Sequence, residues 1–174
     1  MSNTFIISDL HLGHANILTF KRADGITPLR NFISVEEMNE TIISNWNRVV
    51  RPNDKVYNLG DCVIHRKALQ MLRRLNGRQR LIRGNHDIFK TAEYLEFFDE
   101  IYGVRVLSDM ILSHIPLARD CITTRFGTNI HGHLHSNNIA DGAYYNVSVE
   151  NIGYTPISLD DLRKKVAEKK ELYK

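Results

Sequence analysis

Short apolar runs alternate with amphipathic segments along the first half of the chain. Residues 3–8 (NTFIIS), 55–60 (KVYNLG) and 78–84 (RQRLIRG) are rich in apolar and β-branched side chains, which predicts three strands. Between them, residues 34–50 and 66–76 carry apolar side chains every three or four positions, which predicts two helices. This order favours parallel strands joined by crossover helices.

The helix at residues 34–50 has the clearest signals. Ser34 and Glu37 have the spacing of a capping box, and Pro52 follows the last apolar position. Its apolar side chains form one stripe: Val35, Met38, Ile42, Trp46 and Val49. This stripe predicts a face packed in the core. Gly77 stands where a helix that ends near residue 76 would place its terminating glycine.

The second half of the chain has strand-like runs without long predicted helices between them. Residues 91–98 predict a short helix, and Asp141-Gly142 predicts a tight turn. Strand-like runs without long helices between them occupy 101–114, 128–133 and 143–151, and a last helix is expected at 158–172. We therefore expect one α/β domain spanning residues 1–174, with a more parallel first half and a more antiparallel second half.

Polar side chains gather directly after the apolar runs. They follow the expected strands in five groups: Asp9 and His11; Asp61; Asn85, His86 and Asp87; His114; and His131, His133 and His135. In open α/β sheets, ligands bind in the crevice outside the carboxyl ends of the strands. These five segments can therefore meet at one point.

The chemistry of this set indicates metal binding. Carboxylates, imidazoles and a side-chain amide, without thiolate, suit divalent ions such as Mn²⁺, Fe²⁺, Zn²⁺ or Ni²⁺. The ligands are too many for one tetrahedral ion. Two ions that share a bridging carboxylate would use them, and such a pair activates water and stabilises a transferring phosphoryl group.

Five blocks in order resemble the calcineurin-like metallophosphoesterase superfamily. The blocks are Asp9-Leu10-His11, Gly60-Asp61, Gly84-Asn85-His86-Asp87, His114 and Gly132-His133-Leu134-His135. They correspond to the family pattern D-x-H, G-D-x-x-D, G-N-H-[ED], H and G-H-x-H. One departure is Ile64, which stands where the pattern has its second aspartate; His65 beside it is a candidate to compensate.

The resemblance implies a role for each matching residue. Asp9, His11 and His135 would hold one metal, Asn85, His114 and His133 the other, and Asp61 would bridge both. His86 would act beside the substrate phosphate as general acid or charge stabiliser, and Asp87 would orient His86 through a hydrogen bond. The family fold is α/β: two mixed β-sheets packed as a sandwich and flanked by helices, in four αββα layers.

The resemblance also implies hydrolysis of phosphate esters by metal-activated hydroxide, with two divalent ions, Mn²⁺ first among them. The short chain leaves little material for a deep lid, so we expect an open site that takes phosphodiesters such as nucleotides, cyclic nucleotides or nucleic-acid ends. Lys21, Arg22, Arg66 and Arg83 are basic residues expected near its rim, and for each a plain surface charge is favoured over a role in binding. A phosphomonoesterase or protein phosphatase is the alternative enzyme, and a non-catalytic interaction scaffold is the alternative of another class.

Three further histidines and one cysteine lie beside these blocks. His131 is expected to be a hydrogen-bonded structural or supporting residue, and for His14 and His65 a structural role is favoured over substrate contact. Cys62 follows Asp61 directly, but the oxygen and imidazole set is complete without it.

The composition of the chain argues against several classes of protein. The net charge of +3 is too small to indicate a nucleic-acid binder by itself, and its surplus lies largely in the C-terminal segment RKKVAEKKELYK. Two cysteines, Cys62 and Cys121, form no framework, which favours the cytoplasm. We find no apolar run long enough to span a membrane, no secretory signal and no sign of an obligate protein partner.

Overall fold

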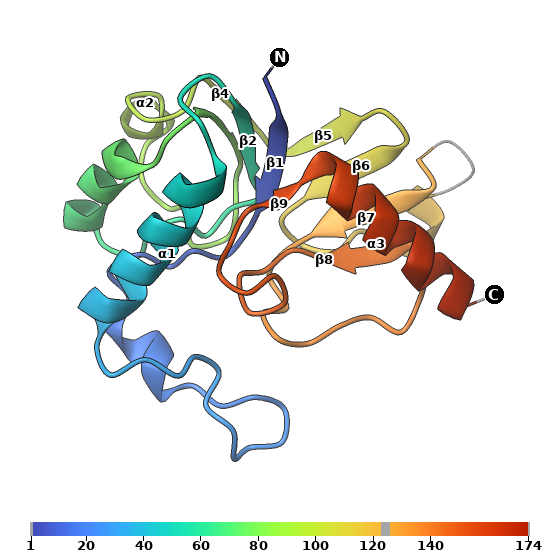
Figure 1. The fold of residues 1–174 in the computed structure, drawn as a ribbon, viewed down its shortest axis with the longest axis horizontal. Helices are drawn as coiled ribbons and strands as arrows, with labels where there is room; N and C mark the ends of the chain where they lie inside the picture. Colours follow the sequence, from blue (N-terminus) through green and yellow to red (C-terminus); the bar gives the residue numbers. More distant parts are fainter. Residues whose placement is uncertain (1, 123–125, 174) are drawn as a thin grey trace.

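Two β-sheets form the centre of the fold in the computed structural model, which describes residues 2–122 and 126–173 (Figure 1). The first sheet has the strand order β4-β3-β2-β1-β9. Its strands are β1 (Thr4–Ile7), β2 (Lys55–Asn58), β3 (Arg78–Ile82), β4 (Glu100–Tyr102) and β9 (Ile157–Ser158). Strands β1 to β4 are parallel, as the alternation of strands and helices predicts, and β9 runs antiparallel to β1.

The second sheet has the order β5-β6-β7-β8 and is mixed. Its strands are β5 (Val104–Leu107), β6 (Met110–Ser113), β7 (Thr128–His131) and β8 (Tyr144–Asn146). Only β5 and β6 pair antiparallel, whereas β6, β7 and β8 are parallel. The antiparallel pairs between named strands thus involve β5, β6 and β9, so the second half is more antiparallel than the first, as expected, although β6, β7 and β8 are parallel. Long loops follow β6 and β7, and they provide the crossover length that parallel strands need without a long helix.

Helices flank the two sheets. The α-helices are α1 (Val35–Val49), α2 (Thr91–Tyr94) and α3 (Leu159–Leu172), and the 3₁₀ helices are η1 (Ala15–Thr19), η2 (Arg66–Arg74) and η3 (Arg119–Ile122). In Figure 1, α1, η2 and α2 lie on the side of the first sheet, and α3 lies across the molecule from them. The architecture is thus α/β, with two mixed sheets and flanking helices, as expected.

Alternate residues of the first sheet face two different cores. Phe5 and Ile7 of β1 pack in a cluster that includes Trp46 of α1, whereas Ile6 between them belongs to another. The second cluster joins side chains of both sheets to Leu162 of α3. The first sheet is therefore buried on both faces, by helices on one and by the second sheet on the other.

Most predicted elements are present, but η2 has a different helix type. Its apolar residues Leu69, Leu72 and Leu75 are spaced by three, which aligns them on one face of a helix with 3.0 residues per turn. The predicted helix is therefore present, as a 3₁₀ helix. The predicted helix at 91–98 is only the four residues of α2.

The expected run at 101–114 is divided into three strands. Gly103 separates β4 from β5, and a turn at Ser108, whose φ is 57°, separates β5 from β6. This division transfers the chain from the first sheet to the second. No helix among the described residues is long and apolar enough to cross a membrane.

Candidate metal centre

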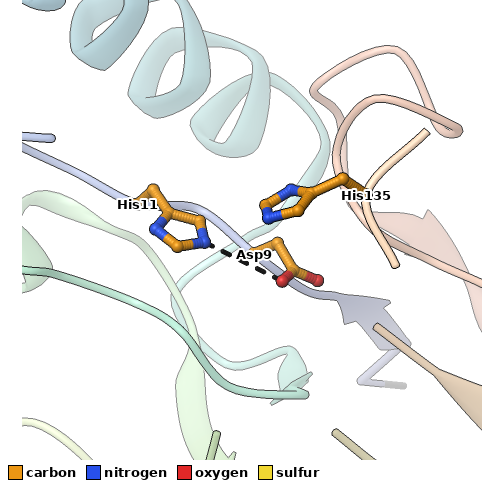
Figure 2. Close-up of side chains that lie close together, drawn as sticks. All are labelled: Asp9, His11 and His135. Atoms are coloured by element: carbon orange, nitrogen blue, oxygen red, sulfur yellow. Dashed lines mark ion pairs between the residues drawn. The ribbon is translucent and has the colours of Figure 1, made fainter. Parts of the chain in front are cut away.

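The loop after β1 turns sharply and is held from behind by a buried arginine. Arg30 is 1% exposed, and its guanidinium donates to the carbonyl oxygens of Asp9 at 2.6 Å and Leu10 at 2.9 Å. This clamp leaves the side chains of Asp9 and His11 free to face the centre. His11 Nε2 lies 3.9 Å from Asp9 Oδ1, and Figure 2 shows the two with His135.

The loops after β2 and β3 are tied together by Asp87. Its carboxylate accepts backbone N–H groups from Asp61 at 2.9 Å, Gly84 at 2.8 Å and Cys62 at 3.1 Å. Asp61 Oδ1 in turn accepts the N–H of His86 at 2.8 Å. Between these described residues, no hydrogen bond joins the Asp87 carboxylate to the His86 ring. The expected orienting bond is therefore replaced by one that fixes the backbone around Asp61.

His114 meets Asp61, and Asn85 links His114 to His133. His114 Nε2 lies 3.3 Å from Asp61 Oδ2 and 2.9 Å from Asn85 Oδ1, while its Nδ1 lies 2.7 Å from the carbonyl of Leu59. His133 Nδ1 lies 3.0 Å from the same Asn85 oxygen. The side-chain oxygen of Asn85 thus lies between a ring nitrogen of His114 and one of His133.

His135 is oriented by a buried ion pair that the sequence motifs do not contain. Glu150 Oε1 lies 3.1 Å from His135 Nδ1 and 2.8 Å from Arg30 Nε, and the side chains of Glu150 and Arg30 are fully buried. The contact to Nδ1 leaves Nε2 of His135 for the centre. Arg30 therefore touches both the loop after β1 and the partner of His135.

The backbone at the centre adopts a conformation that L residues rarely take. Seven non-glycine residues of the described chain have positive φ, and five of them belong to the predicted ligand set: Asp9, His11, Asp61, His133 and His135, with φ from 48° to 68°. This left-handed conformation is sterically costly, and such strain clusters at functional sites. Here it turns successive side chains towards one point.

Close backbone approach also explains two glycines of the motifs. A Cβ on Gly84 would overlap the Asp61 carboxylate, and a Cβ on Gly132 would overlap Ser8 Oγ and Asp9 Oδ2. Only glycine allows these loops to pass so close to the two carboxylates.

The donor atoms fit divalent metal ions. One ligand atom each from Asp9, His11 and His135 lie within 4.8 Å of one another, and the same holds for Asp9, Asp61 and His114. Asp9 Oδ1 and His11 Nε2 are buried and have no hydrogen-bond partner among the described residues. Unpartnered polar atoms are costly inside a protein unless something binds them.

The protonation of the histidines differs with their surroundings. Burial, and then the charge of Arg30, holds the pKa of His11 well below its ordinary value, so its ring is neutral and able to bind a metal. Burial alone would lower the pKa of His114, but the hydrogen bond and charge of Asp61 outweigh it and raise the pKa. A metal that bound His114 would therefore displace a proton.

His135 follows the same logic as His114. Burial works to lower the pKa of His135, and the Glu150 carboxylate more than reverses this and raises it. Burial works to raise the pKa of Glu150, but its contacts with His135 and Arg30 lower it. Glu150 is consequently a carboxylate at neutral pH.

The remaining predicted residues lie at different depths. His86 and Asn85 are exposed at the mouth of the site, and the His86 ring lies 5.6 Å from that of His11, edge to face. His14 Nδ1 lies 3.3 Å from His11 Nδ1. His65 is exposed, and among the described residues no hydrogen bond or ion pair joins it to Asp61, so the support at Asp61 comes from Asp87 rather than from a substitute at position 65.

His131 and Cys62 are buried beneath the centre. His131 Nδ1 lies 2.8 Å from the Gly132 carbonyl, and burial lowers the pKa of His131 to about 4. Cys62 is fully buried, and burial followed by the charge of Asp87 raises the pKa of its thiol well above the usual value. A neutral thiol is a poor metal ligand.

Sequence reasoning missed three residues that support the centre. These are Arg30, Glu150 and Ser148, whose Oγ donates to Asp9 Oδ2 at 2.9 Å. Arg30 and Glu150 are 120 positions apart, and no short motif links them. The one sequence feature that could have pointed to Glu150 is its position as a single glutamate at the end of the predicted strand at 143–151.

The calcineurin-like phosphoesterase family model matches residues 3–173, which is almost the whole chain. The chain belongs to the calcineurin-like phosphoesterases. The five motif blocks that suggested this family from the sequence are the segments that converge at the centre. Family membership and the candidate ligands together support a metal-dependent phosphoesterase.

Relatives of this calcineurin-like phosphoesterase are similar over most of their length. An uncharacterized protein of Methanocaldococcus jannaschii, MJ1445, is 39% identical over 92% of this chain and 89% of its own. The Gene 66 protein of Mycobacterium phage L5 is 32% identical over 78% of this chain and 79% of its own. The crystal structure of AQ665 from Aquifex aeolicus, a protein of unknown function, has a TM-score of 0.74 and 28% identity and covers 94% of this chain and 99% of its own.

Proposed function

We propose that this protein is a phosphodiesterase that depends on two divalent metal ions and acts on nucleotide or nucleic-acid phosphodiesters. The observation that carries the proposal is that two groups of candidate metal ligands adjoin, and that the Asp61 carboxylate faces both, with its Oδ2 near His11 Nε2 on one side and His114 Nε2 on the other. Two adjoining groups that share a carboxylate are what a pair of ions requires.

The proposed ligands divide into two sets. Asp9, His11 and His135 hold one ion, and Asn85, His114 and His133 hold the other. Asp61 bridges them, which is supported by the position of its Oδ2, 3.7 Å from His11 Nε2 in one set and 3.3 Å from His114 Nε2 in the other.

Two bound ions would lower the pKa of a water molecule and neutralise charge on the phosphoryl oxygens. Mn²⁺ is the proposed metal, with Fe²⁺, Zn²⁺ or Ni²⁺ as the other candidates. The mixture of carboxylate, amide and imidazole donors supports this choice, as does the absence of a thiolate at Cys62.

His86 is the proposed catalytic residue. Its ring is exposed beside His11, at the mouth of the site, where a phosphate ester would arrive. We assign it the protonation or charge stabilisation of the leaving oxygen. Asp87 supports it indirectly, because its three backbone hydrogen bonds fix the loop on which His86 stands.

The exposed mouth supports diesters over monoesters, because both ester groups of a diester need space. Nucleotides and nucleic-acid ends are the proposed substrates. The two free cysteines, Cys62 and Cys121, support a cytoplasmic location.

The test is a paired assay with bis-p-nitrophenyl phosphate, a diester, and p-nitrophenyl phosphate, a monoester. Metal-free protein receives Mn²⁺, Ni²⁺, Zn²⁺ or Mg²⁺ in parallel, and the number of bound ions is counted. We expect faster hydrolysis of the diester with two ions bound. Preference for the monoester would favour a phosphomonoesterase, and hydrolysis of neither with both ions bound would favour an interaction scaffold.

A matched pair of variants tests the role of His86. His86→Ala should lower kcat by about 100-fold or more, the usual contribution of a general acid, while the bound metal is unchanged. His65→Ala removes an exposed histidine outside the proposed machinery and should keep the wild-type kcat. Equal turnover in the two variants would contradict the role of His86.

A further inference from the structure

A cavity of about 420 Å³ opens beside the candidate metal centre. One wall is the loop at 20–29, and the other is the segment that follows β7. The lining residues include Phe20, Lys21, Arg22, His133, His135 and Ser136. The volume lies within the range of roughly 300–1,000 Å³ that ligand sites occupy. Because His133 and His135 line it, a molecule in this cavity would lie next to a phosphate at the metals.

The cavity is positively charged. No carboxylate side chain lines it, and neither Lys21 nor Arg22 has an ion pair within 4.0 Å among the described residues. Asp24, the acid of the same loop, accepts hydrogen bonds from Ile26 and Thr27, and its charge interacts with that of Arg22 without forming an ion pair within 4.0 Å. Both cations therefore lack a close carboxylate partner and can meet an anionic ligand.

The two other basic residues expected at the rim are already engaged. Arg66 pairs with Glu93 and lies over the ring of Phe89. Arg83 donates to the carbonyl oxygens of Asp87 and Phe89. This contrast singles out Lys21 and Arg22 as the pair that can bind substrate.

The loop that carries them is held in shape by its own backbone. Leu29 donates to the carbonyl of Phe20 at 2.8 Å, Arg22 to Thr27 at 2.8 Å and Gly25 to Arg22 at 2.9 Å. The loop projects from the body of the molecule, at the lower edge of Figure 1. A preformed loop costs less entropy on binding than one that must be ordered by its ligand.

An aromatic side chain completes the cavity. Phe20 is 45% exposed, although a ring of its size is usually buried. It contacts the ring of His14 edge to face, at 5.8 Å between centroids. Exposed aromatic rings beside basic groups are the platforms on which unpaired bases stack.

We propose that this cavity binds the nucleotide next to the scissile bond, with its phosphate on Lys21 and Arg22 and its base on Phe20. The substrate class is then the end of a nucleic-acid strand, which offers a second phosphate across the sugar from the first. This inference rests on the proposed function, because it places the scissile phosphate at the metals.

Calorimetric binding to the Mn²⁺-loaded protein tests the cavity without turnover of a diester. The probes are thymidine 3′,5′-bisphosphate, which carries two phosphates and one base, and thymidine 5′-monophosphate, which lacks the second phosphate. We expect the bisphosphate to bind about tenfold more tightly at low salt, and this preference to shrink as salt is added. Equal affinities would overturn the proposal.

Matched variants locate the effect. Lys21→Gln/Arg22→Gln should abolish the preference for the bisphosphate, whereas Lys164→Gln/Lys165→Gln, which removes the same charge from exposed positions of α3, should keep it. Phe20→Leu should weaken both probes by about fivefold. Retention of the preference in Lys21→Gln/Arg22→Gln would overturn the proposal.

Two further measurements distinguish strand ends from nucleoside diphosphates as ligands, and the cavity proposal from the proposed function. Thymidine 5′-diphosphate carries its second phosphate on the first, and tighter binding of this probe than of the bisphosphate would overturn the assignment to strand ends. Bis-p-nitrophenyl phosphate has neither a second phosphate nor a base, so its hydrolysis by the wild type and by the Lys164→Gln/Lys165→Gln control, which we expect at equal rates, tests the proposed function apart from the cavity. If the wild type does not hydrolyse this diester, the proposed function is contradicted. The comparison of bisphosphate and monophosphate binding tests the proposal about the cavity separately.

Discussion

Glu150 and Arg30 carry opposite charges inside the protein, and neither side chain meets water. Burying an ion pair is costly, and it is tolerated only when the remaining donors and acceptors are satisfied. Here the spare donors of Arg30 reach two carbonyl oxygens of the loop after β1, and Glu150 Oε1 also meets His135, whereas Glu150 Oε2 is buried without a hydrogen-bond partner among the described residues. The pair therefore positions two sides of the candidate metal centre at once.

Glu150→Gln tests this positioning role. The variant keeps the shape and an oxygen, but it loses the charge that holds His135, so we expect about 10-fold weaker metal binding. The measurement is competition with a chelator for Mn²⁺. Glu40→Gln removes a glutamate from an exposed pair with Arg74 and should leave the affinity unchanged. Equal affinity in Glu150→Gln and the wild type would show that Glu150 is not needed to orient His135.

Asp54 gives a pH dependence remote from the centre. Its carboxylate accepts the backbone N–H groups of Arg51 and Asn3, and these bonds, against the opposing effect of burial, lower its pKa. The unfolded chain therefore takes up this proton first as pH falls. The stability that Asp54 contributes is complete above about pH 4 and is lost as the pH falls below the unfolded value.

Asp54→Asn should accordingly cost about 1–3 kcal/mol at pH 7 and much less at pH 3, since hydrogen bonds to a charged group contribute about that much. Urea unfolding at the two pH values measures the difference. Asp109→Asn, at an exposed aspartate in the turn between β5 and β6, serves as the control and should be neutral at both. A cost for Asp54→Asn that does not change with pH would contradict the assigned cause.

Elements whose signals are local could be predicted from the sequence. Helix α1 is an example, because Ser34 caps it and its stripe packs in the core. Elements that depend on distant partners could not. Strand β9 is two residues long and exists because it pairs with β1. The parallel pairing of β6, β7 and β8 depends on where long loops carry the chain, which periodicity does not record.

The candidate centre shows the same division. The residues that follow strand ends were predictable, because parallel strands bring their carboxyl ends to one edge. The contacts of Asp87 were not, because the sequence does not say whether a carboxylate meets a ring or a backbone. Arg30 and Glu150 were missed because a buried pair separated by 120 positions leaves no local pattern.

The loop between β7 and β8 allows a prediction about geometry. Gly132→Ala would place a methyl group against Ser8 Oγ and Asp9 Oδ2, so we expect the Asp9 carboxylate to be displaced. Metal binding should fall at least tenfold, and the unfolding free energy should drop by about 1–3 kcal/mol. Gly103→Ala, which meets no atom within 4 Å, is the control and should be neutral in both measurements. Metal titration and urea unfolding check both, and a Gly132→Ala variant that binds metal normally would contradict this geometry.

At the scale of the whole molecule, the candidate ligands link five segments between residues 9 and 135. Asp9, Asp61 and Asn85 follow strands of the first sheet, whereas His114 and His133 follow strands of the second. An ion held by both sets would connect the sheets at one edge. Metal binding should therefore stabilise the entire fold rather than one loop.

Metal removal tests this link. Mn²⁺ at 100 times its Kd should add about 2.7 kcal/mol for each site, which corresponds to a Tm higher by about 5–10 °C per site in a chain of this size. A chelator should reverse the rise. Asp61→Asn, which weakens the proposed bridge, should show a smaller one. Differential scanning calorimetry gives the values, and a wild-type Tm that ignores Mn²⁺ would contradict the link between the sheets.

The left-handed backbone at five of these residues lowers the stability of the fold at the same positions that supply the candidate metal ligands. Each such conformation in a residue other than glycine costs about 1–2 kcal/mol, and glycine adopts it almost freely. A version of this chain with glycine at those positions would escape the penalty and lose the donors. Engineering for a longer shelf life would thus select an inert protein, and screening for activity would have to accompany any screening for heat resistance.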